Sequence, residues 1–151
     1  MRQLRTLSAL YCWSEALFLE ALMQIDTYTI SLNVADPKAS ADFITQHFGF
    51  RTLMEIDELS SVGQQDSPFS IVFLKQGLAS FKPASQAGPA NGLLLAFTVA
   101  DVDAEYERIV AAGAPVVTPI ETEPWGERYF QLEDPNGLIL QVVGWVEQPT
   151  R

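Results

Sequence analysis

The chain has 151 residues, 48% hydrophobic and 19% charged, which is the length and composition of one globular domain with its own core. Its formal net charge of −10 disfavours nucleic acid as a partner, because an acidic surface repels a phosphate backbone. A single cysteine excludes an intramolecular disulfide, a single histidine disfavours a metal site, and no apolar run predicts a membrane span, so we expect a cytoplasmic protein.

Residues 1–22 differ in character from the rest of the chain. They begin with arginines and turn apolar, but Glu15 and Glu20 interrupt the apolar stretch and no small-residue cleavage site follows, which disfavours a signal peptide. Apolar residues three and four apart would suit an amphipathic helix. Because the recognisable domain starts directly after Met23, we favour a misassigned start or a disordered leader over a functional helix.

The next segment predicts a strand, a helix and further strands. Residues 27–34 alternate between polar and apolar side chains, which is typical of a strand with one buried face. A helix is predicted over 37–48, with Asp36 as its N-cap, a proline in its first turn and a glycine directly after it. Strands are predicted at about 50–57 and 69–75, and a middle strand between them is poorly marked.

The same order of elements recurs about 65 residues later. Residues 99–101 repeat the Val-Ala-Asp of residues 34–36, and a second predicted helix ends at Gly113. Two later strands are joined by Asp134-Pro135-Asn136-Gly137, a strong reverse-turn sequence. A connector over 81–91 is rich in Pro, Gly, Ser and Ala. The repeat predicts an α+β fold of tandem β-α-β-β-β modules.

Two motifs carry a resemblance to a known family. V-A-D at residues 34–36 is followed by F-G-F at 48–50, and P-W-G-E-R-Y-F-Q-L-E-D-P-N-G occupies 124–137. Both resemble the vicinal oxygen chelate superfamily, in its glyoxalase and bleomycin-resistance branch. The resemblance is specific for a fold and much less so for a function, because one fold carries many chemistries.

The resemblance implies a curved mixed sheet in which the two modules form a cup, with helices outside and ligands inside. It implies one domain over 23–148, with modules at about 24–82 and 92–146 and a tail at 149–151. It also implies a homodimer, since the cups of resistance proteins are completed at a subunit interface.

In catalytic members of the superfamily, His, Glu or Gln side chains on the first and last strands of each module hold a divalent metal. The resemblance puts these positions at Thr29, Leu94, Gln141 and, within one residue, Phe73. Only Gln141 offers a donor atom, and one neutral amide cannot hold a divalent ion against hydration. We therefore expect no metal and no other cofactor, and we place His47 at a helix end away from the cup.

The remaining cup residues predict a moderately apolar pocket with a few neutral polar groups, as in small-molecule sites. Trp125 would either stack on a flat ligand ring or pack under a loop, and these interpretations have equal weight. Tyr129 and Phe130 point to opposite faces, so one of them should face the cup, whereas Glu127 and Arg128 are expected to be structural or solvated. The predicted ligand-binding residues are Thr29, Ser31, Phe73, Leu94, Trp125, Tyr129, Phe130 and Gln141.

No arrangement of nucleophile and base is available in the sequence, and no catalytic residue is predicted. The leading hypothesis is a metal-free protein that binds a small aromatic or cationic compound, as antibiotic-sequestering proteins do. The first alternative is an enzyme of the same superfamily, a lyase, isomerase or dioxygenase, with an atypical metal site. The second is an interaction module in which the leader docks on a partner or on another copy.

Overall fold

The computed structural model describes residues 23, 25–78 and 88–146, so the expected leader over 1–22 lies outside the described residues. The first module comprises β1 (Tyr28–Val34), α2 (Pro37–Phe48), β2 (Arg51–Ile56), β3 (Leu59–Gly63) and β4 (Phe69–Lys75). The second comprises β5 (Leu94–Thr98), α3 (Val102–Ala111), β6 (Val116–Thr122), β7 (Glu127–Glu133) and β8 (Ile139–Trp145). The predicted α+β fold of tandem β-α-β-β-β modules is confirmed.

Each module forms a four-stranded mixed sheet with the same strand order. The first sheet runs β1-β4-β3-β2 and the second runs β5-β8-β7-β6, with the first and last strands of each module parallel and the other pairs antiparallel. The middle strand that the sequence marked poorly is β3, which is short and lies inside the first sheet.

The helices start where the repeated Val-Ala-Asp motif places them. The side chain of Asp36 accepts a hydrogen bond from the backbone N–H of Ala39 at 3.1 Å, and Asp101 does the same for Ala104 at 2.9 Å. Each aspartate therefore satisfies one of the free N–H groups at a helix N-terminus. Helix α2 ends at Gly49, whose φ of 69° is a left-handed conformation that glycine adopts without strain.

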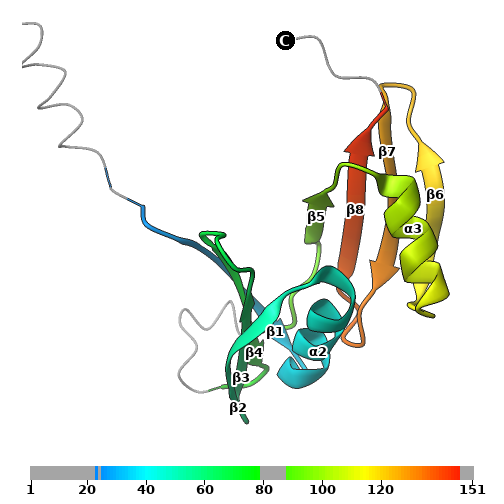
Figure 1. Ribbon diagram of the computed structural model, residues 1–151. Helices are drawn as coiled ribbons and strands as arrows, with labels where there is room; N and C mark the ends of the chain where they lie inside the picture. Colours follow the sequence, from blue (N-terminus) through cyan, green and yellow to red (C-terminus); the bar gives the residue numbers. More distant parts are fainter. Residues whose placement is uncertain (1–22, 24, 79–87, 147–151) are drawn as a thin grey trace, which may run out of the picture.

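One helix covers one face of each sheet, and the hydrophobic core lies between helix and sheet (Figure 1). Alternate residues of β1 and β5, including Leu32 and Leu95, point into this core. Their neighbours point to the opposite face, which we call the open face of each sheet because no helix covers it (Figure 1). The period-two pattern in the sequence thus predicted the faces of both first strands.

Helix α2 also joins the two modules, because its N-terminal end meets the turn between β7 and β8. The Asn136 side chain accepts a hydrogen bond from the Asp36 N–H at 3.0 Å, and donates to the Asp36 carbonyl at 2.7 Å and the Ser40 hydroxyl at 2.8 Å. The buried Ser40 hydroxyl in turn donates to Asp134. At the other end of α2, Arg108 donates to the carbonyl of His47 at 2.8 Å.

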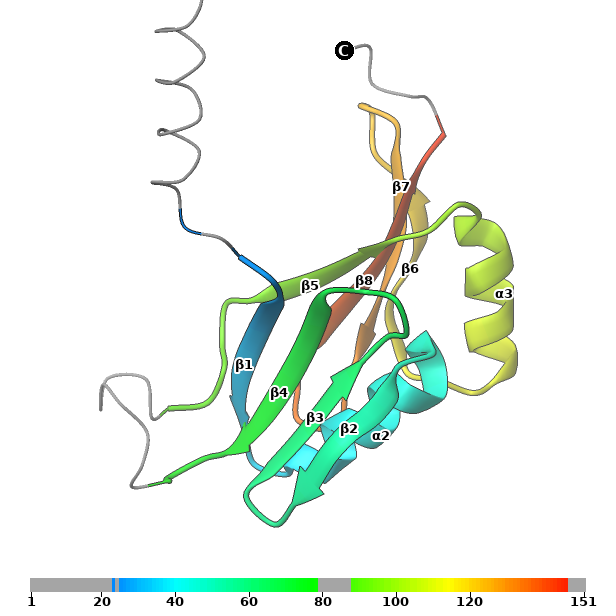
Figure 2. The same ribbon diagram turned by 60° about the vertical axis from the view of Figure 1, so that its left-hand side comes forward.

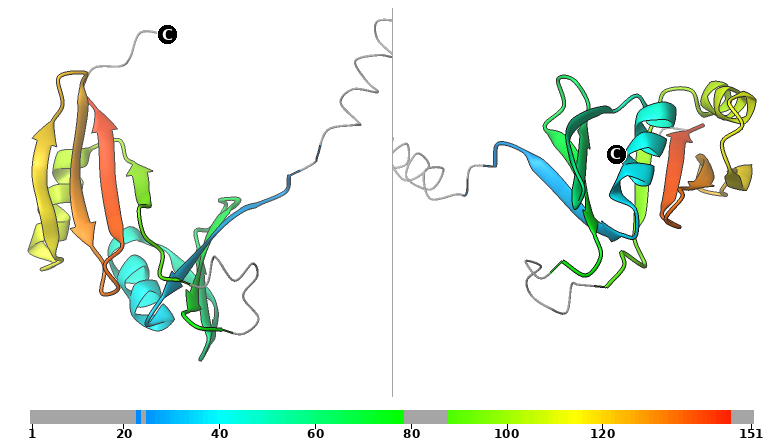
Figure 3. Two further views of the ribbon diagram at one scale, coloured as in Figure 1. Left: turned by 180° about the vertical axis from the view of Figure 1, so that it is seen from behind. Right: turned by 90° about the horizontal axis from the view of Figure 1, so that it is seen from below.

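The open faces of the two sheets point in different directions. In Figure 2 the open face of the first sheet is turned toward the viewer, whereas the second sheet shows its open face only from behind (Figure 3, left). Helix α2 lies between the two sheets in both figures. One chain therefore does not close the cup that the resemblance implied, although each half of it is present. Within the described residues, no helix is long and apolar enough to cross a membrane.

Candidate functional site

The open face of the second sheet carries three of the residues predicted to bind a ligand, Leu94, Tyr129 and Gln141, and Trp125 lies in the turn beside it. It is formed by alternate side chains of its strands, as the pairing of β5 with β8 and of β8 with β7 shows. These side chains are Leu94, Ala96 and Thr98 of β5, Ile139, Gln141, Val143 and Trp145 of β8, and Glu127, Tyr129 and Gln131 of β7. The surface thus combines aliphatic, aromatic and amide groups.

A chain of hydrogen bonds crosses this face from β6 to the start of β7. The Thr118 hydroxyl donates to Gln131 Oε1 at 2.7 Å, and Gln131 Nε2 donates to Gln141 Oε1 at 2.8 Å. Gln141 Nε2 then donates to Glu127 Oε1 at 3.1 Å. Each amide is held on both sides, so the orientation of Gln141 is fixed by its neighbours.

The chain of hydrogen bonds ends at Trp125, in the turn before β7. The indole Nε1–H of Trp125 donates to Glu127 Oε2 at 3.0 Å, so both oxygens of this carboxylate accept a neutral donor. Trp125 nevertheless keeps 61% of its surface exposed. Its ring does not close the fold under a loop, which removes one of the two interpretations that the sequence left open.

Tyr129 lies on the open face, beside two further carboxylates. Its hydroxyl donates to Glu121, and also to Glu123 Oε1 at 3.2 Å. The hydrogen bond to Glu121, together with that to Glu123 and partial desolvation, raises the pKa of the Tyr129 phenol well above its usual range. Tyr129 is therefore a neutral hydrogen-bond donor at physiological pH, and its ring remains available for contact with a ligand.

The basic residues of the second module lie away from this face. Arg128 is directed to the helix side, where it pairs with Asp103 at 2.5 Å and donates to the Thr122 hydroxyl at 2.7 Å. This ion pair raises the pKa of Arg128 and lowers that of Asp103, in each case through the hydrogen bond between them. Arg128 is thus structural, as expected, whereas Glu127 is part of the open face.

The open face of the first sheet is simpler. Thr29 and Ser31 lie on it and are exposed, and the Thr29 hydroxyl shares a hydrogen bond of 2.8 Å with that of Ser70 on β4. Asn33, the next residue in this row, is buried and donates from Nδ2 to the carbonyl of Gly88 at 3.0 Å. Small hydroxyl groups therefore line the β1 side of this face, as the sequence predicted, whereas its β2 side is apolar.

Two predicted site residues belong to the core instead. Phe73 of β4 points to the helix side of the first sheet and is fully buried there, together with Ile71. The open face of β4 presents Val72 and Leu74, the neighbours of Phe73. Phe130 is likewise fully buried and packs edge-on against Tyr106 of α3, with ring centres 5.1 Å apart. The assignment of Phe73 and Phe130 to the ligand site was therefore wrong.

The donor atoms at the superfamily's metal positions do not fit a metal ion. Thr29 offers a neutral hydroxyl that is bonded to Ser70, Leu94 and Val72 offer none, and Gln141 Oε1 already accepts from Gln131. Among the described residues, no three side chains of His, Cys, Asp or Glu lie close enough to hold a metal. A divalent ion needs several charged or imidazole ligands, and this set supplies only neutral oxygens.

His47 lies on the helix side, as predicted. Its ring packs edge-on against Phe43 with centres 4.8 Å apart, and only 5% of the residue is exposed. Burial, and secondarily the charge of Arg108, lower the pKa of His47 below its ordinary value. The histidine is therefore a neutral core residue rather than a ligand.

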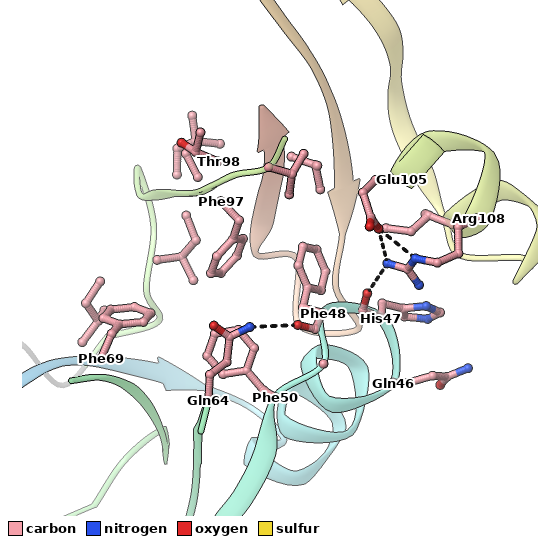
Figure 4. Close-up of a pocket in the computed structure, with 18 residues that line it drawn as sticks. Gln46, His47, Phe48, Phe50, Gln64, Phe69, Phe97, Thr98, Glu105 and Arg108 are labelled. Atoms are coloured by element: carbon pink, nitrogen blue, oxygen red, sulfur yellow. Dashed lines mark hydrogen bonds and ion pairs between the residues drawn. The ribbon is translucent and has the colours of Figure 1, made fainter. Parts of the chain in front are cut away.

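A hollow of about 870 Å³ lies between the modules, lined by residues of the helix side and also by Leu94, Ala96 and Thr98 from the open face of β5 (Figure 4). Phenylalanine rings from both modules line it, and Phe97 contacts Phe48 and Phe50 with ring centres 5.1 and 5.8 Å apart. Arg108 bonds to Glu105 and to a helix carbonyl, and Gln64 donates to the carbonyl of Phe48, whereas the buried Nδ1 of His47 has no hydrogen-bond partner among the described residues. We interpret this hollow as the seam between the modules, where the aromatic core is continuous.

The sequence missed Glu127, Gln131 and Trp145 as residues of the candidate site. A signal was present, because strict alternation from Tyr129 puts Glu127 and Gln131 on the same face of β7. The sequence did not reveal which of Tyr129 and Phe130 faced the ligand, so this alternation could not be used. Trp145 pairs across the sheet with Glu127 and is 43% exposed.

The family of the chain follows from comparison with known proteins. A family model described as Glyoxalase/Bleomycin resistance protein/Dioxygenase superfamily matches residues 24–142. The chain belongs to this superfamily. Uncharacterized proteins of Mycobacterium bovis and Mycobacterium tuberculosis are 43% identical to the chain over 61 residues, which is 40% of this chain and only 39% and 35% of those proteins.

Solved structures of the superfamily include both a binding protein and an enzyme. TnmS3, an antibiotic binding protein from Streptomyces sp. CB03234, has a TM-score of 0.62 at 23% identity and covers 83% of this chain and 98% of its own. Lactoylglutathione lyase from Agrobacterium tumefaciens has a TM-score of 0.62 at 17% identity, covering 82% and 93%. At these identities the likeness shows the fold, and function has to be argued from the site.

Proposed function

We propose that this protein is a metal-independent small-molecule-binding protein of the glyoxalase/bleomycin resistance superfamily that sequesters a planar aromatic compound. The ligand lies on the open face of the second sheet, with its ring against Trp125 and its polar groups toward Gln141. Antibiotics with fused aromatic rings are the first candidates for this ligand, and the cytoplasm is the expected compartment.

The observation that carries this proposal is the chain of hydrogen bonds from Gln141 to Trp125. It links an exposed indole ring to an oriented, largely buried amide beneath the same face, at the position where the superfamily otherwise places a metal ligand. A stacked ring contributes about 0.5–1.5 kcal/mol beyond the burial of its area. Rigid aromatic and amide groups bind neutral planar compounds without the charged ligands that a metal requires.

We further propose that a second copy of the chain completes the site. Large apolar side chains are exposed on both open faces, Leu53, Met54 and Ile56 on the first and Leu94 and Trp145 on the second. Strands β1 and β5 each lie at the edge of a sheet, and an edge strand can pair with a strand of another copy. A twofold dimer would bring the first open face of one copy against the second open face of the other. Sedimentation equilibrium should then give twice the 16.7 kDa of one chain.

An enzymatic function receives no support from a particular observation. The superfamily's catalytic members act through a metal, and the side chains at those positions are the wrong donors, as described above. The carboxylates near Tyr129 have neutral partners on the open face. The hydroxyl and carboxylate of Ser40 and Asp134 are bonded to each other, but both residues are buried where α2 meets the turn between β7 and β8, away from this face.

The proposal is tested by isothermal titration calorimetry with a panel of antibiotics that contain planar aromatic rings, including anthracyclines and bleomycin, in buffer containing EDTA. At least one compound should bind stoichiometrically, and Trp125→Ala should weaken it by about tenfold, since a stacked ring contributes on the order of 1 kcal/mol. Val110→Ala is the matched control, because Val110 is also exposed but lies on α3, away from this face. Binding that is unaffected by Trp125→Ala, or that EDTA abolishes, would overturn the proposal.

A further inference from the structure

We infer that the ligand carries a positively charged nitrogen, which is recognised at Glu127 between Trp125 and Trp145. This inference rests on the proposed function and names the class of compound that the same face selects. The recognition site lies at the end of the second sheet where β7 begins and β8 ends.

Two indole rings lie beside the carboxylate of Glu127 at this end of the sheet. Trp125 donates its indole N–H to Glu127 of β7, and Trp145 of β8 is the direct cross-strand partner of Glu127. The strand ends are held together by the backbone bond from Val146 N–H to the Gly126 carbonyl at 3.0 Å. Both indoles are exposed, and an organic cation is attracted by the faces of aromatic rings as well as by a carboxylate.

No basic side chain pairs with Glu127 among the described residues of this module. Glu127 accepts hydrogen bonds only from neutral groups, Gln141 and Trp125, which stabilise the carboxylate without neutralising it. The described part of the second module contains two basic residues, Arg108 and Arg128. Both point to the helix side, where Glu105 and Asp103 pair with them.

The hydrogen bonds of Thr118, Gln131 and Gln141 all run in one direction across the open face. Thr118 donates to Gln131, Gln131 donates to Gln141, and Gln141 donates to Glu127, so every donor in the series points toward the carboxylate. The dipoles of the two amides therefore converge on the carboxylate and keep it in place on the open face. What the face offers to a ligand near Glu127 is acceptor capacity and negative charge, and Glu121 and Glu123, bonded to the Tyr129 hydroxyl, add to that charge.

A pair of probes that differ in charge and hardly in shape tests the inference. N-methylquinolinium is a permanent cation, and lepidine is the corresponding methylquinoline, which is uncharged at mildly alkaline pH. We expect N-methylquinolinium to bind about tenfold more tightly than lepidine to the wild-type protein, and this preference to shrink as salt is added, because salt screens an exposed charge.

Variants separate the role of the charge from that of the fold. Glu127→Gln should weaken N-methylquinolinium by about tenfold and leave lepidine within about twofold. Glu107→Gln is the matched control, because Glu107 is an exposed carboxylate on α3, and it should change neither affinity. Equal affinities of the wild-type protein for both probes, at low and high salt alike, would overturn the inference while leaving the proposed function intact. Failure of both probes and of every planar antibiotic to bind would overturn the proposed function itself.

Discussion

Replacing Asn136 by alanine tests how the modules are joined. The Asn136 side chain makes three hydrogen bonds to helix α2 of the other module, two with the backbone of Asp36 and one with Ser40. The turn itself would survive the change, because its defining bond from Gly137 N–H to the Asp134 carbonyl uses only the backbone. The variant therefore removes three of the hydrogen bonds between the modules and leaves the turn, the Ser40–Asp134 bond and the aromatic packing in place.

The expected loss follows from these bonds. One intramolecular hydrogen bond contributes about 0.5–1.5 kcal/mol net, so three would contribute roughly 1.5–4.5 kcal/mol if fully buried. Asn136 is half-buried and water can replace part of the loss, so we expect Asn136→Ala to lower the free energy of unfolding by about 2 kcal/mol.

Urea unfolding at equilibrium, followed by tryptophan fluorescence, measures this loss. Asn91→Ala is the matched control, since Asn91 is exposed in the loop before β5, and its effect should stay within about 0.5 kcal/mol. An Asn136→Ala variant no less stable than Asn91→Ala would refute the idea that this turn ties α2 to the second module.

Three further predictions concern the helix side of the molecule. Burial lowers the pKa of His47, so the unfolded state binds a proton more readily than the folded state. The free energy of unfolding should therefore be highest above about pH 6.5 and should fall as the pH drops below it. Urea midpoints measured from mildly alkaline to mildly acidic pH should show this fall in the wild-type protein and a weaker fall in His47→Gln. Phe73→Ala should lower the free energy of unfolding by about 3–5 kcal/mol, while Phe73→Leu should keep ligand affinity unchanged by calorimetry; a selective loss of affinity would return Phe73 to the binding site. Arg128→Ala breaks an exposed ion pair with Asp103 and should lower the urea midpoint only slightly without weakening the ligand, and weaker binding would contradict its placement on the helix side.

Much of the fold could be predicted because the sequence repeats and alternates. The polar row of Thr29 and Ser31, set against apolar neighbours, predicted the open face of β1, and the same motif spacing put Leu94 on the open face of β5. A period of two reveals the faces of a strand when one face is polar and the other apolar.

The same reasoning failed where both faces are apolar. Strand β4 reads Phe-Ser-Ile-Val-Phe-Leu-Lys, so Val72 and Leu74 resemble Phe73 in polarity and the pattern does not tell which side meets the helix. On β7, Tyr129 and Phe130 are both aromatic, and only packing against Tyr106 decides between them. A one-residue slip in register exchanges the faces of a strand, which is what happened at Phe73.

Contacts between distant residues could not be predicted from local patterns at all. The sequence identified Asn136 as a turn residue, yet its side chain bonds to Asp36, one hundred positions earlier. Glu127 resembled a solvated glutamate next to a structural arginine, and its role depends on Gln141 from the neighbouring strand. The direction of each open face is a property of how the modules pack, which no strand pattern contains.

The central claim is that a ligand lies against the open face of the second sheet, and indole resonances test it most directly. Protein labelled with ¹⁵N is titrated with N-methylquinolinium in the presence of EDTA, and the indole N–H signals are assigned with Trp125→Phe and Trp145→Phe variants. The account predicts that the signals of Trp125 and Trp145 shift together and saturate with the affinity that calorimetry gives. Saturable binding that leaves both indole signals unmoved would contradict it.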